Sequence, residues 1–311
     1  MTNTLTALRV GTRGSALARA QTALAVEALL RAYPALDVSE HVIKTTGDQV
    51  TDLPLATIAG GGVFTSALET ALLEGRIDLA VHSAKDLPTD LTPGLILPAY
   101  LPRADVRDVL ISREGHTLAT LPHGALIGTS SPRRATQLRA YRQDFQIRDL
   151  RGNIDTRIAK ALNGEYDAIV LARAGLDRIG RTDVISETLS LADMMPAPGQ
   201  GAICLQVRAA SADLLHPVDH RETHAAVLAE RSFLRALGGG CALPVAAYAY
   251  AAGETLHLRG HVFLPDGSVR INGLDSVSLH GDWRAAAEAL GQTVAGHIRT
   301  KDAGRWLGAI L

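Results

Sequence analysis

Aromatic residues, cysteines and net charge are all scarce in this chain of 311 residues. Aromatic residues make up only 4% of the sequence, and the formal net charge is −1. A nucleic-acid partner is therefore not expected, because nucleic-acid-binding surfaces combine excess positive charge with rings on which bases stack. The two cysteines, Cys204 and Cys241, do not suggest a disulfide framework, so a reducing compartment is the simpler setting.

Long hydrophobic segments are also lacking. The longest uncharged stretch, residues 236–253, is interrupted by three glycines and by Pro244, so we interpret it as a loop and a strand rather than a membrane span. Residues 1–10 contain no basic region followed by an apolar one, so no signal peptide is visible. We expect a cytoplasmic protein with no membrane partner.

The remaining composition is that of a folded globular protein, with 47% hydrophobic and 20% charged residues. A length of 311 residues predicts two or three domains. Arginine outnumbers lysine 27 to 4, so a single arginine carries little information and a lysine within a motif carries more.

Strand-like and helical patterns alternate through the first two thirds of the chain. The predicted strands are residues 8–12, 78–82, 126–129, 146–150 and 168–172. This alternation predicts α/β layers with largely parallel sheets. We interpret the Pro/Gly-rich segments 98–103 and 196–201 as crossings between a pair of α/β domains, with residues 205–207 returning to the first sheet.

The last third has a different pattern, in which a helix is followed by three strands and a second helix over residues 283–298. Asp219 and Glu222 are expected to form a capping box at the start of the first helix, which ends near Leu237. These elements predict a small α+β domain. No internal repeat is visible in the sequence.

Arginines gather in turns that join a predicted strand to a predicted helix. Arg13 follows the first strand, Arg133 and Arg134 open the helix for which Ser131 is the expected N-cap, and residues 151–157 have an arginine at each end. Adjacent cations at a helix N-terminus oppose the helix dipole, which costs stability unless an anion is bound there. Because open α/β sheets bind ligands at the carboxyl ends of strands, these turns predict a polycarboxylate or phosphate site. The alternative is a set of ordinary turns with surface arginines.

Two further motifs carry reactive side chains. Asp86 follows Lys85 after a buried strand, and the neighbouring cation favours an ionised carboxylate that could hold a developing positive charge or relay a proton. A loop ion pair is the alternative. Cys241 lies in a glycine-rich loop that suits a thiolate nucleophile, although a chance loop cysteine is equally open. Cys204 lies in the apolar run 202–207 and is interpreted as part of the core.

Other patterns are interpreted as structural. His216, His220 and His224 are spaced by four, but no carboxylate or thiol pattern completes a metal site, so a solvated helix is favoured and no metal is expected. Arg139 and Arg142 are interpreted as a solvated helix face. The sequence has no phosphate-loop motif and no serine nucleophile elbow.

Seven segments, taken in order, resemble the porphobilinogen deaminase family, also called hydroxymethylbilane synthase, over nearly the whole chain. They are GTRGSALARAQ (11–21), VHSAKDLPT (81–89), GTSSPRRATQL (128–138), LRGNIDTR (150–157), GEYDAIVLARAGLDRIG (164–180), PAPGQGA (196–202) and ERSFLRALGGGCALPV (230–245). Each segment is weak alone, but the ordered set is specific.

The resemblance implies an α/β fold with two doubly wound lobes, similar to those of periplasmic binding proteins, around a cleft, and a small α+β C-terminal domain. Residues 1–102 and 198–217 would form domain 1 with the catalytic Asp loop, and residues 103–197 an arginine-rich domain 2. Residues 218–311 would form domain 3 with the attachment cysteine. The resemblance also suggests a monomer.

The family further implies a covalent dipyrromethane cofactor, held on Cys241 by a thioether. The enzyme would extend this cofactor by four porphobilinogen units with loss of ammonia, and hydrolysis would release hydroxymethylbilane for porphyrin and haem synthesis. Asp86 occupies the family position of the catalytic carboxylate. The positions that match family binders of cofactor and substrate are Arg13, Ser15, Ser83, Lys85, Thr129, Ser130, Ser131, Arg133, Arg134, Arg151, Arg157, Arg178, Gln200 and Gly201.

One segment, residues 59–66, departs from the family pattern. The family often has lysines before its second helix, whereas the corresponding positions here are Gly61 and Ser66. Ser66 and Glu69 are expected to form a capping box instead. Arg13 and Lys85 would then carry more of the substrate binding.

Two other functions remain as alternatives. A solute-binding protein would have the same two lobes without chemistry, but the missing signal peptide and the third domain argue against it. A nucleic-acid-binding protein is disfavoured by the nearly neutral net charge and the few aromatic residues.

Overall fold

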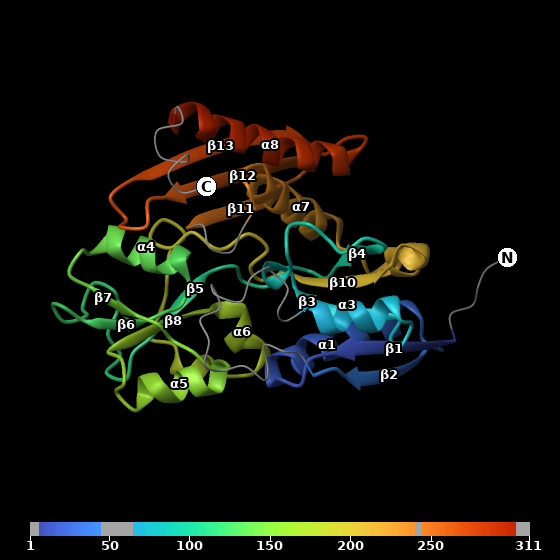
Figure 1. The fold of residues 1–311 in the computed structure, drawn as a ribbon, viewed down its shortest axis with the longest axis horizontal. Coiled ribbons are helices and arrows are strands. Elements are labelled where there is room, and N and C mark those ends of the chain that lie inside the picture. The colour runs from blue at the N-terminus through green and yellow to red at the C-terminus, as the bar shows by residue number, and fades with distance from the viewer. Residues whose placement is uncertain (1–5, 45–64, 240–243, 303–311) are drawn as a thin grey trace. The chain divides into compact units, whose positions relative to one another are not determined.

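The computed structural model describes residues 6–44, 65–239 and 244–302. Two positions singled out in the sequence, Gly61 and Cys241, lie outside these ranges. Figure 1 shows the arrangement of the helices and strands, with the labels used below.

The chain divides into two compact units, each made of two separate stretches of sequence. The first unit contains Met1–Ala104 and Ala202–His224, and the second contains Asp105–Gly201 and Ala225–Leu311. Two of the three boundaries, after Ala104 and after Gly201, lie at the ends of the two Pro/Gly-rich segments of the sequence. The second unit also includes most of the C-terminal third, so the three-domain limits given above stay a prediction.

A five-stranded sheet forms the centre of the first unit. Its strands are β1 (Ala7–Thr12), β2 (Asp37–Val42), β3 (Leu79–Ser83), β4 (Leu95–Tyr100) and β10 (Ile203–Arg208). They lie in the order β2-β1-β3-β10-β4, with β1 parallel to β2 and β3, and β10 antiparallel to β3 and β4. The predicted return of residues 205–207 to the first sheet is confirmed.

Helices cover both faces of this sheet. They are α1 (Ala16–Ala32) and α3 (Ser66–Leu73), and the short 3-10 segments η2 (Ala84–Asp86) and η4 (Ala209–Val218) follow β3 and β10. Leu79 and Val81 of β3 join the core that contains Leu29 of α1, whereas Ala80 joins the core that contains Leu68 of α3. Alternate residues of β3 therefore face opposite cores, as in a sheet buried on both sides.

The second unit contains a sheet of its own. Its strands are β5 (Asp108–Ile111), β6 (Leu126–Gly128), β7 (Gln146–Arg148), β8 (Ala168–Ala172) and β9 (Glu187–Thr188), in the order β7-β6-β8-β5-β9. Its helical segments are α4 (Pro132–Tyr141), α5 (Ile154–Leu162), α6 (Arg173–Arg178) and η3 (Thr182–Val184). Ser131 is the N-cap of α4, with Pro132 in its first turn, as predicted.

The two sheets have the same strand plan. In each, the first strand of a parallel trio lies between the second and the third. An antiparallel strand from outside the trio separates the third strand from the edge strand. In the first unit that strand is β10, and in the second it is β5. The sequence showed no repeat because shared topology requires only similar hydrophobic patterns, not similar residues.

The C-terminal elements form a third sheet within the second unit. The strands β11 (Val245–Ala252), β12 (Thr255–Phe263) and β13 (Arg270–Ser278) are antiparallel, and α7 (Arg221–Ala236) and α8 (Trp283–Asp302) supply its helices. Phe233 of α7 and Val294 of α8 share a core with Leu258 of β12. The predicted α/β fold with a small C-terminal α+β portion is confirmed.

Both predicted capping boxes are wrong, because long-range partners take the acidic side chains. Ser66 is already helical, the N-cap Thr65 makes no side-chain cap, and the Glu69 carboxylate binds elsewhere. Helix α7 begins at Arg221, so His220 precedes it, and His220 Nδ1 accepts the Thr223 N–H at 3.2 Å.

Asp219, the predicted cap of α7, accepts from Tyr100 N–H at 2.9 Å and contacts His224 Nδ1 at 2.9 Å. His224 is therefore buried, which contradicts the predicted solvated helix at that position. Among residues 6–44, 65–239 and 244–302, no group of three potential metal ligands is found.

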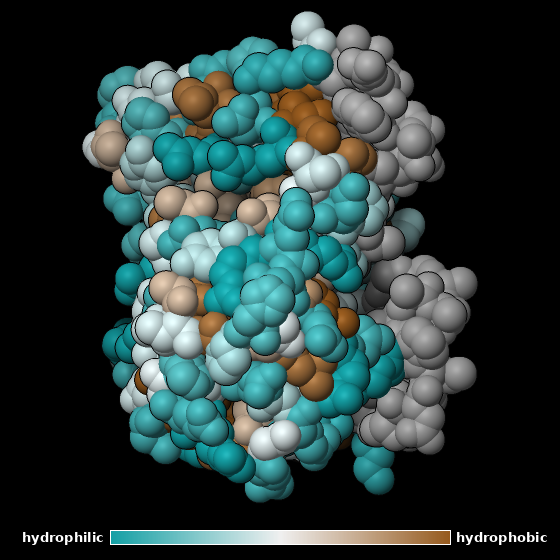
Figure 2. All heavy atoms as spheres, turned by 90° about the vertical axis from the view of Figure 1, so that its left-hand side faces the viewer, coloured by the Kyte–Doolittle hydropathy of each residue, from teal (hydrophilic) through white to brown (hydrophobic). Residues whose placement is uncertain are grey.

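The surface drawn in Figure 2 is mainly hydrophilic, and its hydrophobic side chains form small, separate patches. Within the described parts of the chain, no helix combines the length and the apolar character needed to cross a membrane.

Candidate active site

In the first unit, the predicted site residues follow two neighbouring strands. Because β1 and β3 are parallel and adjacent, their carboxyl ends lie at the same edge of the sheet. Arg13 and Ser15 follow β1, Ser83 ends β3, and Lys85 and Asp86 lie in η2 directly after it. The structure brings these five residues to the edge at which parallel α/β sheets bind ligands.

Backbone contacts hold the turn that carries Asp86. The Ala84 N–H donates to the Ala202 carbonyl oxygen at 3.0 Å, and Gln21 Nε2 donates to Ser83 Oγ at 2.7 Å. The Asp86 carboxylate is exposed and accepts no hydrogen bond from another described residue. Its position is therefore set by the backbone of η2, and the side chain is exposed.

In the second unit, three parallel strands end at one edge. β6 lies between β7 and β8, so the turns after all three strands lie side by side. The predicted residues in these turns are Thr129, Ser130, Ser131, Arg133 and Arg134 after β6, Arg151 and Arg157 after β7, and Arg178 after β8. The arginine-bearing turns thus lie at carboxyl strand ends, as the sequence predicted.

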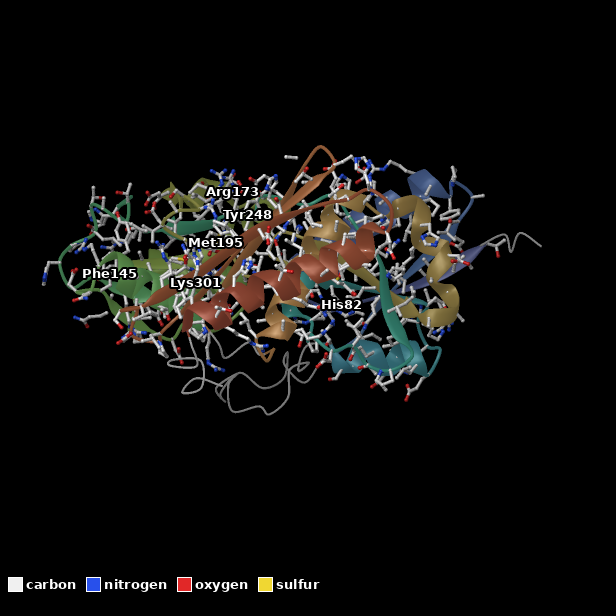
Figure 3. The ribbon with its side chains drawn as sticks, turned by 90° about the horizontal axis from the view of Figure 1, so that it is seen from above. His82, Phe145, Arg173, Met195, Tyr248 and Lys301 are labelled. Atoms are coloured by element: carbon white, nitrogen blue, oxygen red, sulfur yellow. The ribbon has the colours of Figure 1, made fainter. Side chains whose placement is uncertain are left out.

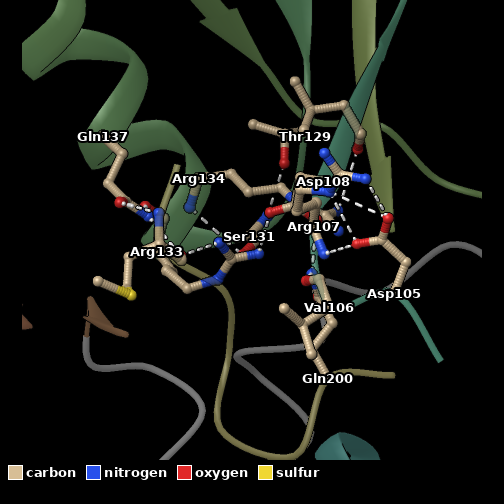
Figure 4. Close-up of polar contacts among 12 residues, drawn as sticks. Asp105, Val106, Arg107, Asp108, Thr129, Ser131, Arg133, Arg134, Gln137 and Gln200 are labelled. Carbon is tan, nitrogen blue, oxygen red and sulfur yellow. Dashed lines mark hydrogen bonds and ion pairs between the residues drawn. The ribbon is translucent and has the colours of Figure 1, made fainter. Parts of the chain in front are cut away.

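Asp108 is the residue at this edge that the sequence analysis missed. Arg133 Nη2 and Arg134 Nη2 each lie 2.7 Å from a different oxygen of its carboxylate (Figure 4). Asp108 is completely buried, and the two arginine side chains are only 5% and 9% exposed. An anion is expected at the N-terminus of α4, and the Asp108 carboxylate of the protein itself supplies one there. An acidic residue opening an otherwise apolar strand, Asp108–Ile111, was the available signal for a buried charge pair.

The charges at this cluster do not cancel. Burial alone would raise the pKa of Asp108, but the two guanidinium groups hold that pKa well below its usual range. One carboxylate thus faces two permanent cations, which leaves one positive charge in a region of low polarity. The Nε atoms of Arg133 and Arg134 are buried and have no acceptor among the described residues. The uncompensated positive charge and these two Nε–H donors favour the binding of an external anion.

Loop 196–201 closes around the same cluster. Gln200 Nε2 donates to Asp108 Oδ1 at 2.9 Å and to the Val106 carbonyl oxygen at 2.7 Å. Arg133 Nη1 donates to the Met195 carbonyl oxygen at 2.6 Å. Gln200 is therefore a structural partner of Asp108, whatever else it contacts.

The three predicted hydroxyl groups are used to shape the turn after β6. Thr129 Oγ1 accepts from Ser131 N–H at 3.2 Å, and Ser131 Oγ accepts from Arg134 N–H at 3.5 Å. Ser130 Oγ donates to the Leu150 carbonyl oxygen at 2.9 Å and accepts from its N–H at 3.0 Å. Ser130 thereby ties the turn after β6 to the turn after β7.

The remaining arginines are half-buried at the same edge. Arg157 Nε donates to the Gly152 carbonyl oxygen at 2.7 Å, and Gly152 has φ +109°, a conformation that favours glycine. Arg178 Nη2 donates to the Gly201 carbonyl oxygen at 2.6 Å. Burial lowers the pKa of Arg178 to about 10, so it remains a cation at neutral pH. Gly201 thus contributes its carbonyl oxygen to positioning Arg178.

Two other arginines are less solvated than the sequence suggested. Arg139 Nη1 donates to the Pro265 carbonyl oxygen at 3.0 Å. Arg142 pairs with Asp144 at 2.7 Å and lies 4.4 Å from the Phe145 ring centroid. The interpretation of Arg142 as a solvated side chain is wrong, because its guanidinium also binds carbonyl oxygens of the segment before β6.

Of the two cysteines, only Cys204 lies among the described residues. Cys204 is completely buried in β10, and its Sγ lies 3.6 Å from the His82 carbonyl oxygen, which confirms its place in the core. The chain preceding Cys241 leaves α7 through Gly238 and Gly239, which have φ values of 101° and 49°. Cys241 itself lies outside the described residues.

Each unit is therefore an α/β layer with cationic turns at the carboxyl ends of its parallel strands, as in a protein that binds a polyanionic small molecule. The family model described as "Porphobilinogen deaminase, dipyromethane cofactor binding domain" matches residues 8–216. The model described as "Porphobilinogen deaminase, C-terminal domain" matches residues 224–300. The chain belongs to the porphobilinogen deaminase family.

Named relatives agree with the family models. The porphobilinogen deaminase of Roseiflexus castenholzii is 48% identical over 281 residues, which cover 89% of this chain and 91% of the relative. That of Moorella thermoacetica is 45% identical over 303 residues, which cover 96% and 95%. The predicted family, its hydroxymethylbilane synthase activity and its dipyrromethane cofactor are thus confirmed.

Among solved structures, the chain is similar to the periplasmic VFT2 domain of Bordetella pertussis BvgS. The sequence identity is 14% and the TM-score is 0.41, with 69% of this chain and 87% of that domain covered.

Proposed function

We propose that this chain catalyses stepwise porphobilinogen polymerisation with Asp86 as its catalytic carboxylate, Cys241 as the cofactor attachment site and the turn arginines as carboxylate binders. The observation that carries this assignment is the exposed Asp86 carboxylate, which follows β3 beside Lys85 and accepts no hydrogen bond from any described side chain or backbone group. An exposed carboxylate that accepts no hydrogen bond from a described group is suited to a cationic reacting group.

Asp86 supplies electrostatic stabilisation and proton transfer. Loss of ammonia from porphobilinogen leaves a cationic azafulvene, which a nearby carboxylate stabilises. The pyrrole ring that attacks this cation must afterwards lose a proton, and the same carboxylate is able to accept it. Because Asp86 is fixed only through the backbone of η2, its side chain can follow the reacting carbon through both events.

The turn arginines bind the carboxylates of the pyrrole rings. Each ring carries two carboxylates, so a growing chain is a dense polyanion, and arginine is the side chain that pairs with carboxylates in a bidentate manner. Arg13 and Lys85 serve this purpose in the first unit, and Arg151, Arg157 and Arg178 do so in the second. Ser15, Ser83, Thr129, Ser130, Ser131, Gln200 and Gly201 contribute hydroxyl, amide or backbone contacts.

The residues present fit a dipyrromethane. Arg133 and Arg134 retain buried Nε–H donors and one uncompensated positive charge beside Asp108, which suits a ligand carrying several carboxylates. When bound, the cofactor supplies the pyrrole carbon to which the first substrate is joined. Attachment at Cys241 is favoured over Cys204, since the Cys204 thiol is completely buried within β10.

The further properties of the protein are part of the same proposal. We expect a cytoplasmic monomer that acts on a small molecule and binds no nucleic acid, which the net charge of −1 supports. We expect the three-domain limits given by the resemblance. Gly61 and Ser66 stand where the family often has lysines, so Arg13 and Lys85 carry more of the substrate binding.

The substitution Asp86→Asn tests the catalytic assignment. The variant should fold and bind porphobilinogen normally, because no described group depends on the charge, while kcat falls by about a hundredfold or more. The matched control is Asp213→Asn, whose side chain is 98% exposed and pairs only at the surface with His216. Ammonia release and substrate binding are measured for both.

Near-normal turnover by the Asp86→Asn variant would remove Asp86 from the mechanism. Reversible porphobilinogen binding by the parent protein without ammonia release would instead support the solute-binding alternative.

A further inference from the structure

A buried chain of hydrogen bonds runs beneath the turn that carries Asp86. Thr92 Oγ1 donates to Glu69 Oε2 at 2.8 Å, and Gln206 Nε2 donates to Glu69 Oε1 at 2.9 Å. Gln206 Oε1 lies 3.0 Å from His82 Nε2. Glu69, His82 and Gln206 are 7%, 5% and 0% exposed, so water does not compete for these contacts.

The direction of every bond in this chain follows from Glu69. Both Glu69 carboxyl oxygens accept, one from Thr92 Oγ1 and the other from Gln206 Nε2, so the Gln206 group that faces Glu69 is the NH₂. The Gln206 oxygen then faces His82 and can only accept, so His82 Nε2 must carry the proton. A neutral His82 consequently has an unprotonated Nδ1. The geometry thus assigns a single tautomer to a histidine that would otherwise have two.

Burial accounts for the neutral ring on which this assignment depends. Desolvation lowers the pKa of His82 to about 4, with a smaller contribution from the positive charge of Arg13, while the hydrogen bond with Gln206 opposes the shift. The ring is therefore neutral at physiological pH.

This series of hydrogen bonds ends at His82, next to the proposed catalytic turn. His82 is in β3, one residue before Ser83 and two residues before the first residue of η2 (His82 is labelled in Figure 3). Its backbone pairs with Cys204 of β10, and Cys204 Sγ approaches its carbonyl oxygen. Because Asp86 is held only through the backbone of η2, any rotation of the end of β3 is transmitted to its carboxylate.

We propose that Glu69 is a positioning residue for the polymerisation: acting through Gln206, it holds His82 in the Nε2–H tautomer and thereby fixes the end of β3 from which Asp86 is presented. This inference rests on the proposed role of Asp86. It adds two residues from outside the ligand-binding edge, Glu69 of α3 and Gln206 of β10, to the set on which turnover depends.

Nitrogen NMR of the purified holoenzyme, labelled with ¹⁵N-histidine, tests the tautomer directly. The His82 signals are identified by their loss in the His82→Gln variant. We expect the parent enzyme to show one neutral tautomer, protonated at Nε2. In Glu69→Gln the new amide can donate as well as accept, so the Gln206 amide is no longer held in one orientation. The Nδ1–H tautomer of His82 should then also be populated. An Nδ1–H tautomer, or a mixture, in the parent enzyme would overturn the inference.

Steady-state kinetics on the same proteins test the consequence. Glu69→Gln should lower kcat about tenfold or more, as expected for a small displacement of a reacting group, with a smaller effect on KM. His82→Gln should retain much of the activity because its amide nitrogen replaces Nε2–H as a donor, whereas His82→Leu should not. Glu74→Gln is the matched control at the C-cap of the same helix, since the Glu74 carboxylate is exposed and pairs at the surface with Arg76.

The outcomes separate this inference from the proposed function. If Glu69→Gln populates both tautomers yet keeps the parental kcat, or if His82→Gln is no better than His82→Leu, the positioning role fails while the Asp86 assignment stands. If Asp86→Asn itself keeps its turnover, the proposed function fails irrespective of the His82 tautomer. Should Glu69→Gln prevent folding, the comparison of His82→Gln with His82→Leu still decides the positioning role.

Discussion

Arg133 and Arg134, neighbours in the first turn of α4, donate to opposite oxygens of one buried carboxylate at 2.7 Å each. That carboxylate, Asp108, fixes the direction of both guanidinium groups before any ligand arrives. The arrangement is pre-organised, because the cost of orienting the two side chains is met during folding rather than during binding. It also leaves a positive charge that an acidic ligand can neutralise.

Replacing Asp108 should be among the most destabilising changes at the site. In Asp108→Asn two buried guanidinium groups lose the carboxylate that pairs with both of them, and we expect a loss of about 3–5 kcal/mol in the free energy of unfolding. Urea denaturation measures this loss. The control Asp183→Asn removes a carboxylate that is 65% exposed beside Arg181 and should cost less than about 1 kcal/mol. Equal, small losses in both variants would show that Asp108 does not hold the arginines.

A methyl group added at Gly128 should disturb the turn that follows β6. An alanine Cβ there would lie 2.8 Å from Tyr166 Cδ1 and 3.0 Å from Ile169 Cγ2, too close for either neighbour to remain in place. We expect Gly128→Ala to destabilise the protein by about 1–3 kcal/mol and to lower the fraction of molecules that carry the cofactor. Thermal unfolding and intact mass measure the two effects.

Gly296 provides the matched control for that substitution. It lies within α8, and apart from the backbone of its own helix no atom of the described residues is within 4 Å of the Cβ that alanine would add. Gly296→Ala should therefore stabilise the helix by up to about 1 kcal/mol and leave cofactor loading unchanged. A stabilising effect of Gly128→Ala as well would contradict the close packing at the end of β6.

The pH dependence of stability should include a contribution from His261 of β12. Burial lowers its pKa from 6.5 to about 4, with smaller contributions from Arg270 and Arg259. The unfolded chain therefore takes up a proton on His261 before the folded chain does. The stabilising contribution is complete above pH 6.5 and is lost as the pH falls towards about 4.

Replacing His261 by glutamine should remove this contribution. The unfolding free energy of His261→Gln should then decline less between pH 7 and pH 4 than that of the parent protein. Parallel declines in the two proteins would contradict the burial of a neutral ring at position 261.

The local signals in the sequence were sufficient for much of the fold. The Ser131-Pro132 helix start and the strand-to-helix turns were predictable because N-caps and chain reversals depend on residues a few positions apart. The same reasoning failed for Glu69 and Asp219, whose carboxylates bind partners far away in the sequence. A capping box competes with such contacts, and the tertiary structure decided against it in both cases.

The site itself was predictable in outline but not in its charge balance. The arginine-bearing turns were visible, since each follows a strand within a few residues. Asp108 was missed because its partners Arg133 and Arg134 come 25 and 26 residues later in the chain, and only folding brings them together. The tautomer of His82 was likewise hidden, because it depends on Gln206, 124 residues away.

The intact mass of purified, active protein shows whether a dipyrromethane is attached at Cys241. We expect a mass above that of the sequence by one dipyrromethane, lost in Cys241→Ser and retained in Cys204→Ser. Active protein whose mass equals that of its sequence would rule out the covalent cofactor, and an adduct that depends on Cys204 would rule out attachment at Cys241.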